Sequence, residues 1–461
     1  MNKNEISTPL YTAPEIITVE DSFNAEKSDI YSYSIIIFEV ITALKPYQNI
    51  TSIPKFYMDV VKCLRPKIPN SVPTQYKELM VQCWDKNPNK RPTFKEIIEL
   101  FKTDVFLNDK NIDHKLFEEY VDYIDNYKES ITDSKFIRPL SHADKNKMKE
   151  KHSDKEDKIL KSKNIPIINL KNYTKKEYVG SGKYSKVFRI MNIKTNKNFA
   201  AKISFQINGN VFSEVNIMQK LNHPSILKFI GYSPVNFKND KDPTIITEYA
   251  ENGSLQNIID KAPNKIIMNS TRRLIIIYGI VAGMAYLHEH SILHNDLKPS
   301  NVLLDEKFYP KISDFGLAQK TNNSEDDEDA FVSNSEDGLN IKGTPSYIAP
   351  ETWSDQVYNK ETDMYAFGVL LYEIICMKKA FQGLKHFQIA YKVAHRERPI
   401  FSASKKDDVF KPLIERCWDQ DPFRRPTFND LLDELKDDDY MTIDVYQKEF
   451  KKYVQLVQSF K

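Results

Sequence analysis

Two short motifs carry the side chains most capable of chemistry in this chain. They are His-Asn-Asp-Leu-Lys-Pro-Ser-Asn at residues 294–301 and Lys-Ile-Ser-Asp-Phe-Gly at residues 311–316. Asn301 and Asp314 offer oxygen ligands, and Mg²⁺ binds well to one or two such ligands plus phosphate oxygens. Asp296 can orient a hydroxyl group and accept its proton, and Lys298 can neutralise phosphoryl oxygens. This set suits phosphoryl transfer, which needs mainly positioning and charge stabilisation from the protein.

A glycine-containing stretch lies upstream of these motifs. Val179, Gly180, Ser181 and Gly182 begin a pattern typical of a strand, a turn and a second strand, in which small residues let backbone amides approach phosphate oxygens. Ser185 stands where a third glycine would be expected, which should stiffen the loop without removing the phosphate cradle. Two spaced glycines are also common in ordinary hairpins, so this pair indicates a phosphate-binding loop only together with the neighbouring motifs.

A lysine and a glutamate follow this loop. Lys202 ends a short apolar stretch and can hold the α- and β-phosphates of a nucleotide. Glu214 begins a run of apolar residues at helical spacing, so it can face Lys202 from the inner side of a helix. A single helix glutamate is usually solvated, but the order of glycine loop, lysine and glutamate favours an ion pair.

With these motifs in this order, residues 170–438 resemble a complete eukaryotic protein kinase domain, nearest to the tyrosine-kinase-like serine/threonine group. The resemblance implies an α+β, bilobal fold: an antiparallel β-sheet with one regulatory helix, then a mainly α-helical lobe. It also implies ATP and Mg²⁺ as cofactors, with ATP between the lobes. The residues expected to act in catalysis are Asp296, Lys298, Asn301 and Lys202, and the expected metal ligands are Asn301 and Asp314.

The resemblance also assigns an adenine site. Residues 245–250 resemble the hinge between the lobes, with Thr247 as the gatekeeper. The backbone of Glu248 and Ala250 would hydrogen-bond adenine, and Val187 and Ala200 would cover the ring. The full set expected to contact the cofactor is Val179, Gly180, Ser181, Gly182, Val187, Ala200, Lys202, Glu214, Thr247, Glu248 and Ala250.

Several supporting residues follow from the same resemblance. Glu351 would form a buried ion pair with Arg425, and Asp363 would support the catalytic loop from beneath. Thr344 would contact both the base and the lysine beside it. Because serine/threonine kinases of this fold carry lysine two residues after the base, Lys298 favours serine and threonine hydroxyls of protein substrates.

Two features bear on regulation. Asn295 precedes the base where many of these enzymes carry arginine, so a phosphorylated activation segment would lack a charge-assisted partner. We therefore expect activation by another route, such as dimerisation or release of an inhibitory contact; strong activation by a phosphomimetic loop would refute this. The activation segment, between Asp314 and Glu351, also holds an acidic insert, residues 324–329 and 335–338, that is typical of a solvated loop. Alternatively, the insert competes for a basic substrate groove or is modified at Ser324, Ser333 or Ser335.

The start of the chain repeats part of the downstream sequence. Residues 8–15 repeat the pattern of residues 344–351, and the likeness continues in step. The further matched segments are 27–34 with 361–368, 83–94 with 417–428, and 117–121 with 450–454. The first copy thus keeps part of a helical lobe, without glycine loop, phosphate lysine, base or metal ligand, and cannot transfer phosphate by the same chemistry.

We therefore expect five parts: a partial kinase domain (1–102), a helical tail of the first repeat (103–130), a charged linker (131–169), a complete protein kinase domain (170–438) and a C-terminal helical tail (439–461). The partial copy has apolar helix faces built for a partner. Three interpretations are open: residues 1–130 are a docking module for proteins, an unstable remnant, or the end of a domain whose true start lies upstream of Met1.

Composition indicates a soluble, cytoplasmic protein. The chain has 461 residues, 41% of them hydrophobic, and a formal net charge of +2, which does not point to nucleic acid as a partner. The apolar run from Leu274 to Leu287 is too short for a membrane span and fits a buried helix. Four cysteines without close pairing and the lack of a signal-peptide core favour the cytoplasm.

Two functions of different classes remain open. The first is ATP- and Mg²⁺-dependent phosphorylation of serine and threonine in intracellular signalling. The second is a kinase-like scaffold, or pseudokinase, that binds partners without efficient phosphoryl transfer. Such scaffolds usually lack the base, the phosphate lysine or the metal aspartate, whereas this sequence keeps all three. Metal-dependent turnover separates the two functions, because both classes can bind ATP.

Overall fold

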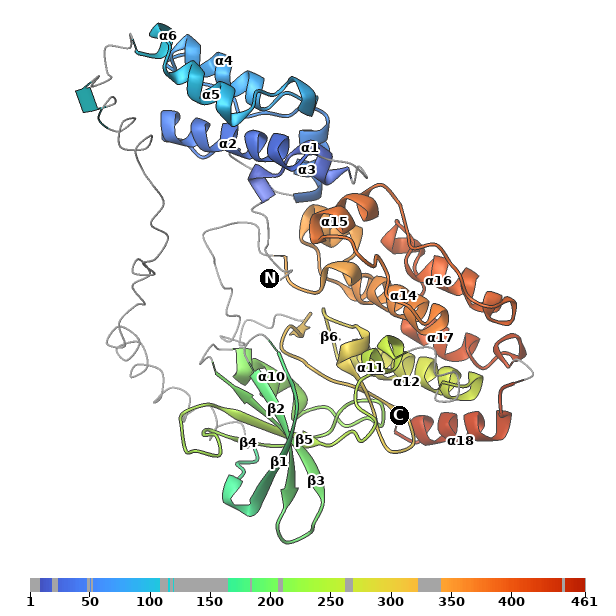
Figure 1. Cartoon of the computed structure of the whole chain (residues 1–461). Helices are drawn as coiled ribbons and strands as arrows, with labels where there is room; N and C mark the ends of the chain where they lie inside the picture. Colours follow the sequence, from blue (N-terminus) through green and yellow to red (C-terminus); the bar gives the residue numbers. More distant parts are fainter. Residues whose placement is uncertain are drawn as a thin grey trace. The chain divides into compact units, whose positions relative to one another are not determined.

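The computed structural model describes residues 9–18, 24–47, 50, 53–107, 115–116, 119, 165–182, 185–205, 210–261, 268–321, 341–441 and 444–460. The chain divides into two compact units (Figure 1). Unit 1 comprises residues 1–50 and 55–164, and unit 2 comprises residues 51–54 and 165–461. The predicted modification sites Ser324, Ser333 and Ser335, and nearly all of the predicted tail and linker between residues 108 and 164, lie outside the described residues.

The upstream part of unit 2 is a five-stranded antiparallel β-sheet with the strand order β1-β2-β3-β5-β4. Its strands are β1 (Tyr173–Ser181), β2 (Ser185–Asn192), β3 (Asn198–Ser204), β4 (Phe229–Ser233) and β5 (Thr244–Glu248). Helix α10 (Asn210–Met218) follows β3 and carries Glu214. This arrangement confirms the predicted antiparallel sheet with one helix.

The strand register separates the two faces of this sheet. One face carries a buried apolar cluster formed by Leu170, Ile190, Ala201 and Ile246. Val187 lies opposite Lys202 across β2 and β3, and Ala200 lies opposite Thr247 across β3 and β5. Because alternate residues of a strand point to opposite faces, these four residues share the face away from the cluster. The sheet therefore collects four predicted nucleotide contacts on one side.

The downstream part of unit 2 is mainly helical, as predicted. Its helices are α11 (Leu255–Asp260), α12 (Ser270–Glu289), α13 (Pro350–Asp355), α14 (Lys360–Cys376), α15 (His386–Ala394), α16 (Lys411–Cys417), α17 (Phe428–Glu434) and α18 (Gln447–Gln458). Two short antiparallel ribbons pair β6 (Ile292–Leu293) with β9 (Gln319–Lys320), and β7 (Val302–Leu304) with β8 (Pro310–Ile312). The 3₁₀ turns of this part are η4 (Pro299–Asn301), η5 (Pro345–Tyr347), η6 (Lys405–Phe410), η7 (Pro422–Arg424) and η8 (Asp438–Tyr440), whereas η3 (Leu170–Asn172) comes directly before β1.

Helix α12 forms the buried centre of this part. Asn269 caps its N-terminus by accepting a hydrogen bond from the backbone of Arg272, and nearly every residue from Leu274 to Leu287 is buried. This confirms the predicted buried helix before the catalytic loop. Within the described part of the chain, no helix combines the length and apolar character needed to cross a membrane.

The C-terminal helix α18 packs against α12. The rings of Phe450 and Tyr278 meet edge to face at 5.5 Å, and Tyr453 Oη lies 3.1 Å from the buried hydroxyl of Ser225. A Cβ on Gly279 of α12 would lie 2.3 Å from Tyr453 Oη, so only glycine allows this approach. The tail thus connects α12 to the loop that follows α10.

The described elements of unit 1 are all helical. They are η1 (Pro9–Tyr11), α1 (Pro14–Ile17), α2 (Ala25–Thr42), α3 (Ile53–Val61, whose first two residues fall in unit 2), α4 (Thr74–Cys83), η2 (Pro88–Lys90), α5 (Phe94–Phe101) and α6 (Asp104–Leu107). This agrees with the predicted partial helical lobe.

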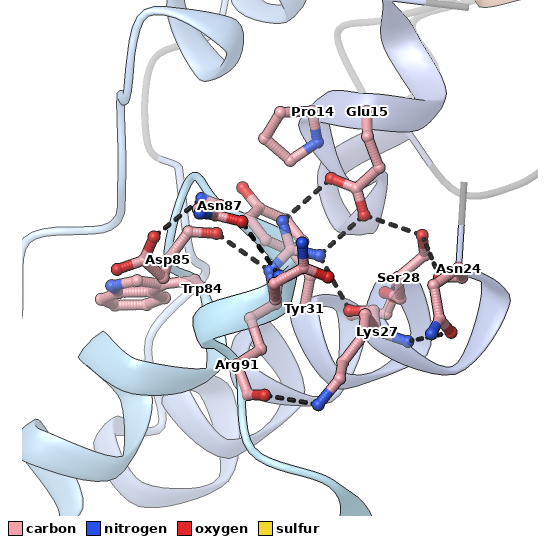
Figure 2. A network of polar contacts seen from close by, with 12 residues as sticks. Pro14, Glu15, Asn24, Lys27, Ser28, Tyr31, Trp84, Asp85, Asn87 and Arg91 are labelled. Carbon is pink, nitrogen blue, oxygen red and sulfur yellow. Dashed lines mark hydrogen bonds and ion pairs between the residues drawn. The ribbon is translucent and has the colours of Figure 1, made fainter. Parts of the chain in front are cut away.

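A buried network around Arg91 joins α1 and α2 to the turn that contains η2 (Figure 2). Arg91 donates to both carboxylate oxygens of Glu15, with Nη1–Oε1 and Nη2–Oε2 distances of 2.7 and 2.9 Å. It also donates to the backbone carbonyls of Lys27 and Asp85, and Ser28 donates to Glu15. Both partners of the ion pair are almost completely buried. Removing either partner would leave an unpaired charge inside unit 1.

Candidate active site

The loop after β6 places Asp296 among three other predicted residues. Lys298 Nζ lies 2.6 Å from Asp296 Oδ2, and the Thr344 hydroxyl donates to Asp296 Oδ1 at 2.8 Å. Lys298 Nζ also donates to the Thr344 hydroxyl at 2.7 Å. Asn301 Nδ2 donates to the carbonyl of Asp296 at 2.9 Å. The prediction that Thr344 contacts both Asp296 and Lys298 is therefore confirmed.

Asp363 supports this loop from α14, as predicted. Its Oδ2 accepts the backbone N–H of His294 and its Oδ1 accepts the backbone N–H of Asn295, both at 2.9 Å. His288 Nε2, from α12, lies 3.0 Å from Oδ2. The Asp363 side chain is only 1% exposed, so these groups have no competing water. The two backbone bonds fix the loop immediately before the candidate base.

A second charged cluster brings together Lys202, Glu214 and Asp314. Lys202 Nζ lies 2.8 Å from Glu214 Oε1 and 2.8 Å from Asp314 Oδ1. The predicted ion pair between Lys202 and Glu214 is therefore confirmed. Burial alone would lower the pKa of Lys202, but the two carboxylates outweigh it and hold that pKa above its ordinary value. Partial burial would raise the pKa of Asp314, yet the Lys202 charge holds it below its ordinary value.

Asn301 and Asp314 fit the oxygen donors that magnesium requires. The amide nitrogen of Asn301 is used by Asp296, which leaves Oδ1, contacted by the Ser300 hydroxyl at 3.4 Å, as the acceptor. Asp314 is half exposed and uses Oδ1 for Lys202. Among the described residues, no cluster of three or more His, Cys, Asp or Glu side chains is arranged for a metal. The remaining ligands of a magnesium ion would thus be phosphate oxygens and water.

The glycine loop joins β1 to β2, which pair antiparallel as predicted. Gly180 lies opposite Val187, and the N–H of Gly182 donates to the carbonyl of Ser185 at 2.9 Å. A Cβ on Gly180 would meet no atom within 4 Å, so the space beside its backbone is open. Such space is what a phosphate group needs to approach the amides. Val179 and Ser181, also predicted to contact the cofactor, lie in β1 on either side of Gly180.

The predicted hinge leaves β5 at Glu248. Thr247 is buried at the end of this strand, and its hydroxyl donates to the carbonyl of Glu248 at 3.0 Å. The N–H of Glu248 donates to the carbonyl of Lys228, so adenine could use only the second lone pair of the Glu248 carbonyl, which already accepts the Thr247 hydroxyl. Ala250 is also buried. The roles of Glu248 and Ala250 toward adenine stay predictions.

The predicted ion pair of Glu351 and Arg425 is confirmed. Arg425 Nη1 and Nη2 donate to the two Glu351 oxygens at 2.6 and 2.9 Å, and the Arg425 side chain is completely buried. This bidentate geometry joins α13 to the turn before α17.

Two contacts near the site were not predicted. The side-chain amide of Asn295 donates to the carbonyl of Leu317 at 3.0 Å, which ties the start of the activation segment to the catalytic loop. Tyr347, next to Thr344, donates its hydroxyl to the buried Glu373 at 2.7 Å. Because the repeat carries Tyr11 and Glu39 at the matching positions, the second contact had a signal in the sequence.

Comparison with known families agrees with this geometry. The family model described as "Protein kinase domain" matches residues 173–437, which is more than half of the chain. The chain belongs to the protein kinase family. A second model, described as "Protein tyrosine and serine/threonine kinase", matches residues 1–101, the region of the partial copy. The bilobal α+β kinase fold expected from the sequence is therefore confirmed.

Similar proteins carry kinase names. The dual specificity protein kinase pyk3 of Dictyostelium discoideum is 30% identical over 439 residues, covering 94% of this chain and 30% of that protein. The serine/threonine-protein kinase CTR1 of Arabidopsis thaliana is 30% identical over 273 residues, covering 57% of this chain and 31% of that protein. The dual specificity protein kinase shkC of Dictyostelium discoideum is 31% identical over 282 residues, covering 58% of this chain and 51% of that protein. The chain thus spans less than a third of the first two relatives.

Proposed function

We propose that unit 2 is an ATP- and Mg²⁺-dependent kinase that phosphorylates serine and threonine hydroxyls of proteins. The observation that carries this proposal is the geometry at Asp296, whose two carboxylate oxygens are held by Lys298 and Thr344 at hydrogen-bond distance. A carboxylate fixed in this way can orient an acceptor hydroxyl and take its proton.

In the proposed reaction, a bond forms between the acceptor oxygen and the γ-phosphorus of ATP, and the bond from that phosphorus to the β,γ-bridging oxygen breaks. ADP leaves with the electron pair of the broken bond. Asp296 accepts the hydroxyl proton, and Lys298 neutralises charge on the transferred group. Lys202, positioned by Glu214 at 2.8 Å, holds the α- and β-phosphates.

We propose Asn301 and Asp314 as the protein ligands of magnesium. When bound, the ion would neutralise charge on the phosphate oxygens. The Lys202 ammonium group contacts one oxygen of Asp314. When nucleotide binds, this ammonium group would therefore lie between a carboxylate and the phosphates. Three other predicted cofactor contacts, Val187, Ala200 and Thr247, lie on the sheet face that carries Lys202.

The acceptor preference is proposed from Lys298 and from the names of the relatives. Lysine two residues after the base is typical of serine/threonine kinases, and one of the three relatives described above carries that name. Two others are named dual specificity kinases, so tyrosine peptides belong in the test.

We further propose a cytoplasmic signalling role, supported by four free cysteines. The five-part division, with docking of proteins through residues 1–130, is also retained as a proposal.

The test is Mg²⁺-dependent transfer of labelled γ-phosphate from ATP to serine, threonine and tyrosine peptide libraries by the full chain. Asp296→Asn and Lys202→Met should each reduce transfer by at least ~10³-fold, since each removes a group used in the transition state. Transfer to serine and threonine alone would establish the acceptor preference. Nucleotide binding without metal-dependent transfer in the parent chain would instead favour the scaffold function.

A further inference from the structure

Unit 1 and the helical part of unit 2 can be compared position by position, because they make the same local contacts. Tyr33 and Phe94 meet edge to face at 5.4 Å in unit 1, and the matching pair Phe367 and Phe428 meets edge to face at 5.5 Å in unit 2. The buried arginine networks correspond in the same way. Helix α2 therefore matches α14, and α5 matches α17.

The two units differ sharply in what covers these helices. In unit 1, Val40 is 76% exposed and Ile36 is 47% exposed on α2, and Ile98 is 54% exposed on α5. The residues at the matching positions of unit 2 are completely or almost completely buried: Ile374, Leu370 and Leu432. We call the surface formed by Ile36, Val40, Phe94 and Ile98 the α2–α5 face.

Unit 2 shows what covers the corresponding surface there. Helix α12 packs against both α14 and α17. His288, in its last turn, meets the ring of Phe428 edge to face at 5.0 Å and approaches Asp363 at 3.0 Å. The loop after α12 then gives two backbone N–H groups to the same carboxylate.

Asp29 of unit 1 occupies the position of Asp363. Its side chain is exposed, and within the described residues no hydrogen bond is made to it. The α2–α5 face thus combines an apolar surface with a carboxylate at the point where α12 and its loop would end. An exposed apolar surface of this kind marks an interaction site.

We propose that the α2–α5 face binds a helix with the chemistry of α12: a long apolar helix with a histidine in its last turn, followed by a loop that presents two backbone N–H groups to Asp29. The apolar helix covers Ile36, Val40 and Ile98, and the polar end fixes its direction and register. The partner segment is therefore the start of a kinase helical lobe and not a generic amphipathic helix.

Val81, another exposed apolar residue of unit 1, does not share this pattern. Val81 of α4 is 54% exposed, but its counterpart in unit 2 is Glu415, which is exposed as well. The position of Val81 is thus exposed to solvent in both units. Val81 provides a matched control, because a charge introduced there changes apolar exposure away from the α2–α5 face.

The test is direct binding of a fluorescent peptide with the sequence of residues 268–297, carrying solubilising lysines at its ends, to the full chain. We expect saturable binding in fluorescence anisotropy. Val40→Glu and Ile36→Glu should each weaken it at least tenfold, and Asp29→Lys should weaken it severalfold. Val81→Glu should leave it unchanged. All four positions are exposed, so the variants should fold, which near-ultraviolet circular dichroism checks.

Three results would overturn the proposal. The first is the lack of saturable binding to the parent chain. The second is equal binding by the parent, by Val40→Glu and by Val81→Glu, and the third is equal binding of a scrambled peptide, since general apolar adsorption then explains the signal. The Lys202→Met chain should bind the peptide as the parent does, which separates this result from any loss of kinase activity.

Discussion

Arg91 and Arg425 make the same contacts in two parts of the chain that differ in chemistry. Each donates twice to a glutamate, and each donates to two backbone carbonyls, with the four corresponding distances agreeing within 0.1 Å. Unit 1 nevertheless has no counterpart of Lys202, Asp296 or Asp314 in its sequence. The comparison shows that the network around the arginine stabilises helices and does not depend on a catalytic loop.

The aspartates on α2 and α14 show the opposite behaviour. Asp363 is buried and holds the backbone of His294 and Asn295, whereas Asp29 is exposed. The same residue type at the same helix position is thus a positioning residue in one unit and a solvated carboxylate in the other. Its role is decided by whether a loop lies above it.

The largest effect should come from the buried arginines. Arg425→Met and Arg91→Met each leave a glutamate unpaired, so each should destabilise its own unit by about 3–5 kcal/mol. Hydrogen exchange followed by mass spectrometry resolves the two units: α16 and α17 should lose protection in the first variant, and α4 and α5 in the second. A loss confined to one variant would break the structural equivalence of the two networks.

The second effect is a difference in kcat between variants of Asp363 and Asp29. Asp363→Asn leaves one backbone N–H of the catalytic loop without an acceptor, at a cost of about 1–3 kcal/mol, so kcat should fall by roughly 10- to 100-fold. Asp29→Asn should leave kcat within about twofold, because that side chain is solvated. Steady-state kinetics with one peptide substrate checks both. Equal losses in the two variants would contradict the assigned roles.

The third effect is a change in how stability depends on pH, and it is tested by comparing variants of Glu373 and Glu39. Burial raises the pKa of Glu373 to about 7 from an ordinary 4.5, although Ala380 N–H and the Tyr347 hydroxyl act against this. The folded state therefore binds more protons than the unfolded state between pH 4.5 and 7, and stability falls as the pH rises through this window. One proton accounts for at most ~1.4 kcal/mol per pH unit.

Glu373→Gln should remove this part of the pH dependence and stabilise unit 2 above pH 7. Glu39→Gln is the matched control, because Glu39 accepts the Tyr11 hydroxyl at the same 2.7 Å but is less buried. Denaturant unfolding at pH 5, 6, 7 and 8 measures both. A pH slope that persists in Glu373→Gln would assign the titration to another group.

Much of the candidate site was predictable from the sequence because its residues lie in short motifs. The pairs of Lys202 with Glu214 and of Glu351 with Arg425 were expected and are present, as are the contacts of Thr344 with Asp296 and Lys298. Contacts of a side chain with a backbone carbonyl were missed, such as Asn295 with Leu317, because any residue type supplies a carbonyl. The contact of Tyr453 with Ser225 was missed because it joins positions far apart in the sequence.

The sequence by itself determined the kinase motifs, their order and the repeat, because these depend on residue type and spacing along the chain. Only the tertiary structure decided which repeated residues act in the same way. Glu15 and Glu351 both meet their arginine, since all their partners lie within the repeated segment. Asp29 and Asp363 differ because the partners of Asp363 come from α12 and its loop, outside the repeat. A buried hydrogen bond forms only where the partner group lies close by in the folded chain. The sequence pattern of one segment does not show which group of another segment will lie there.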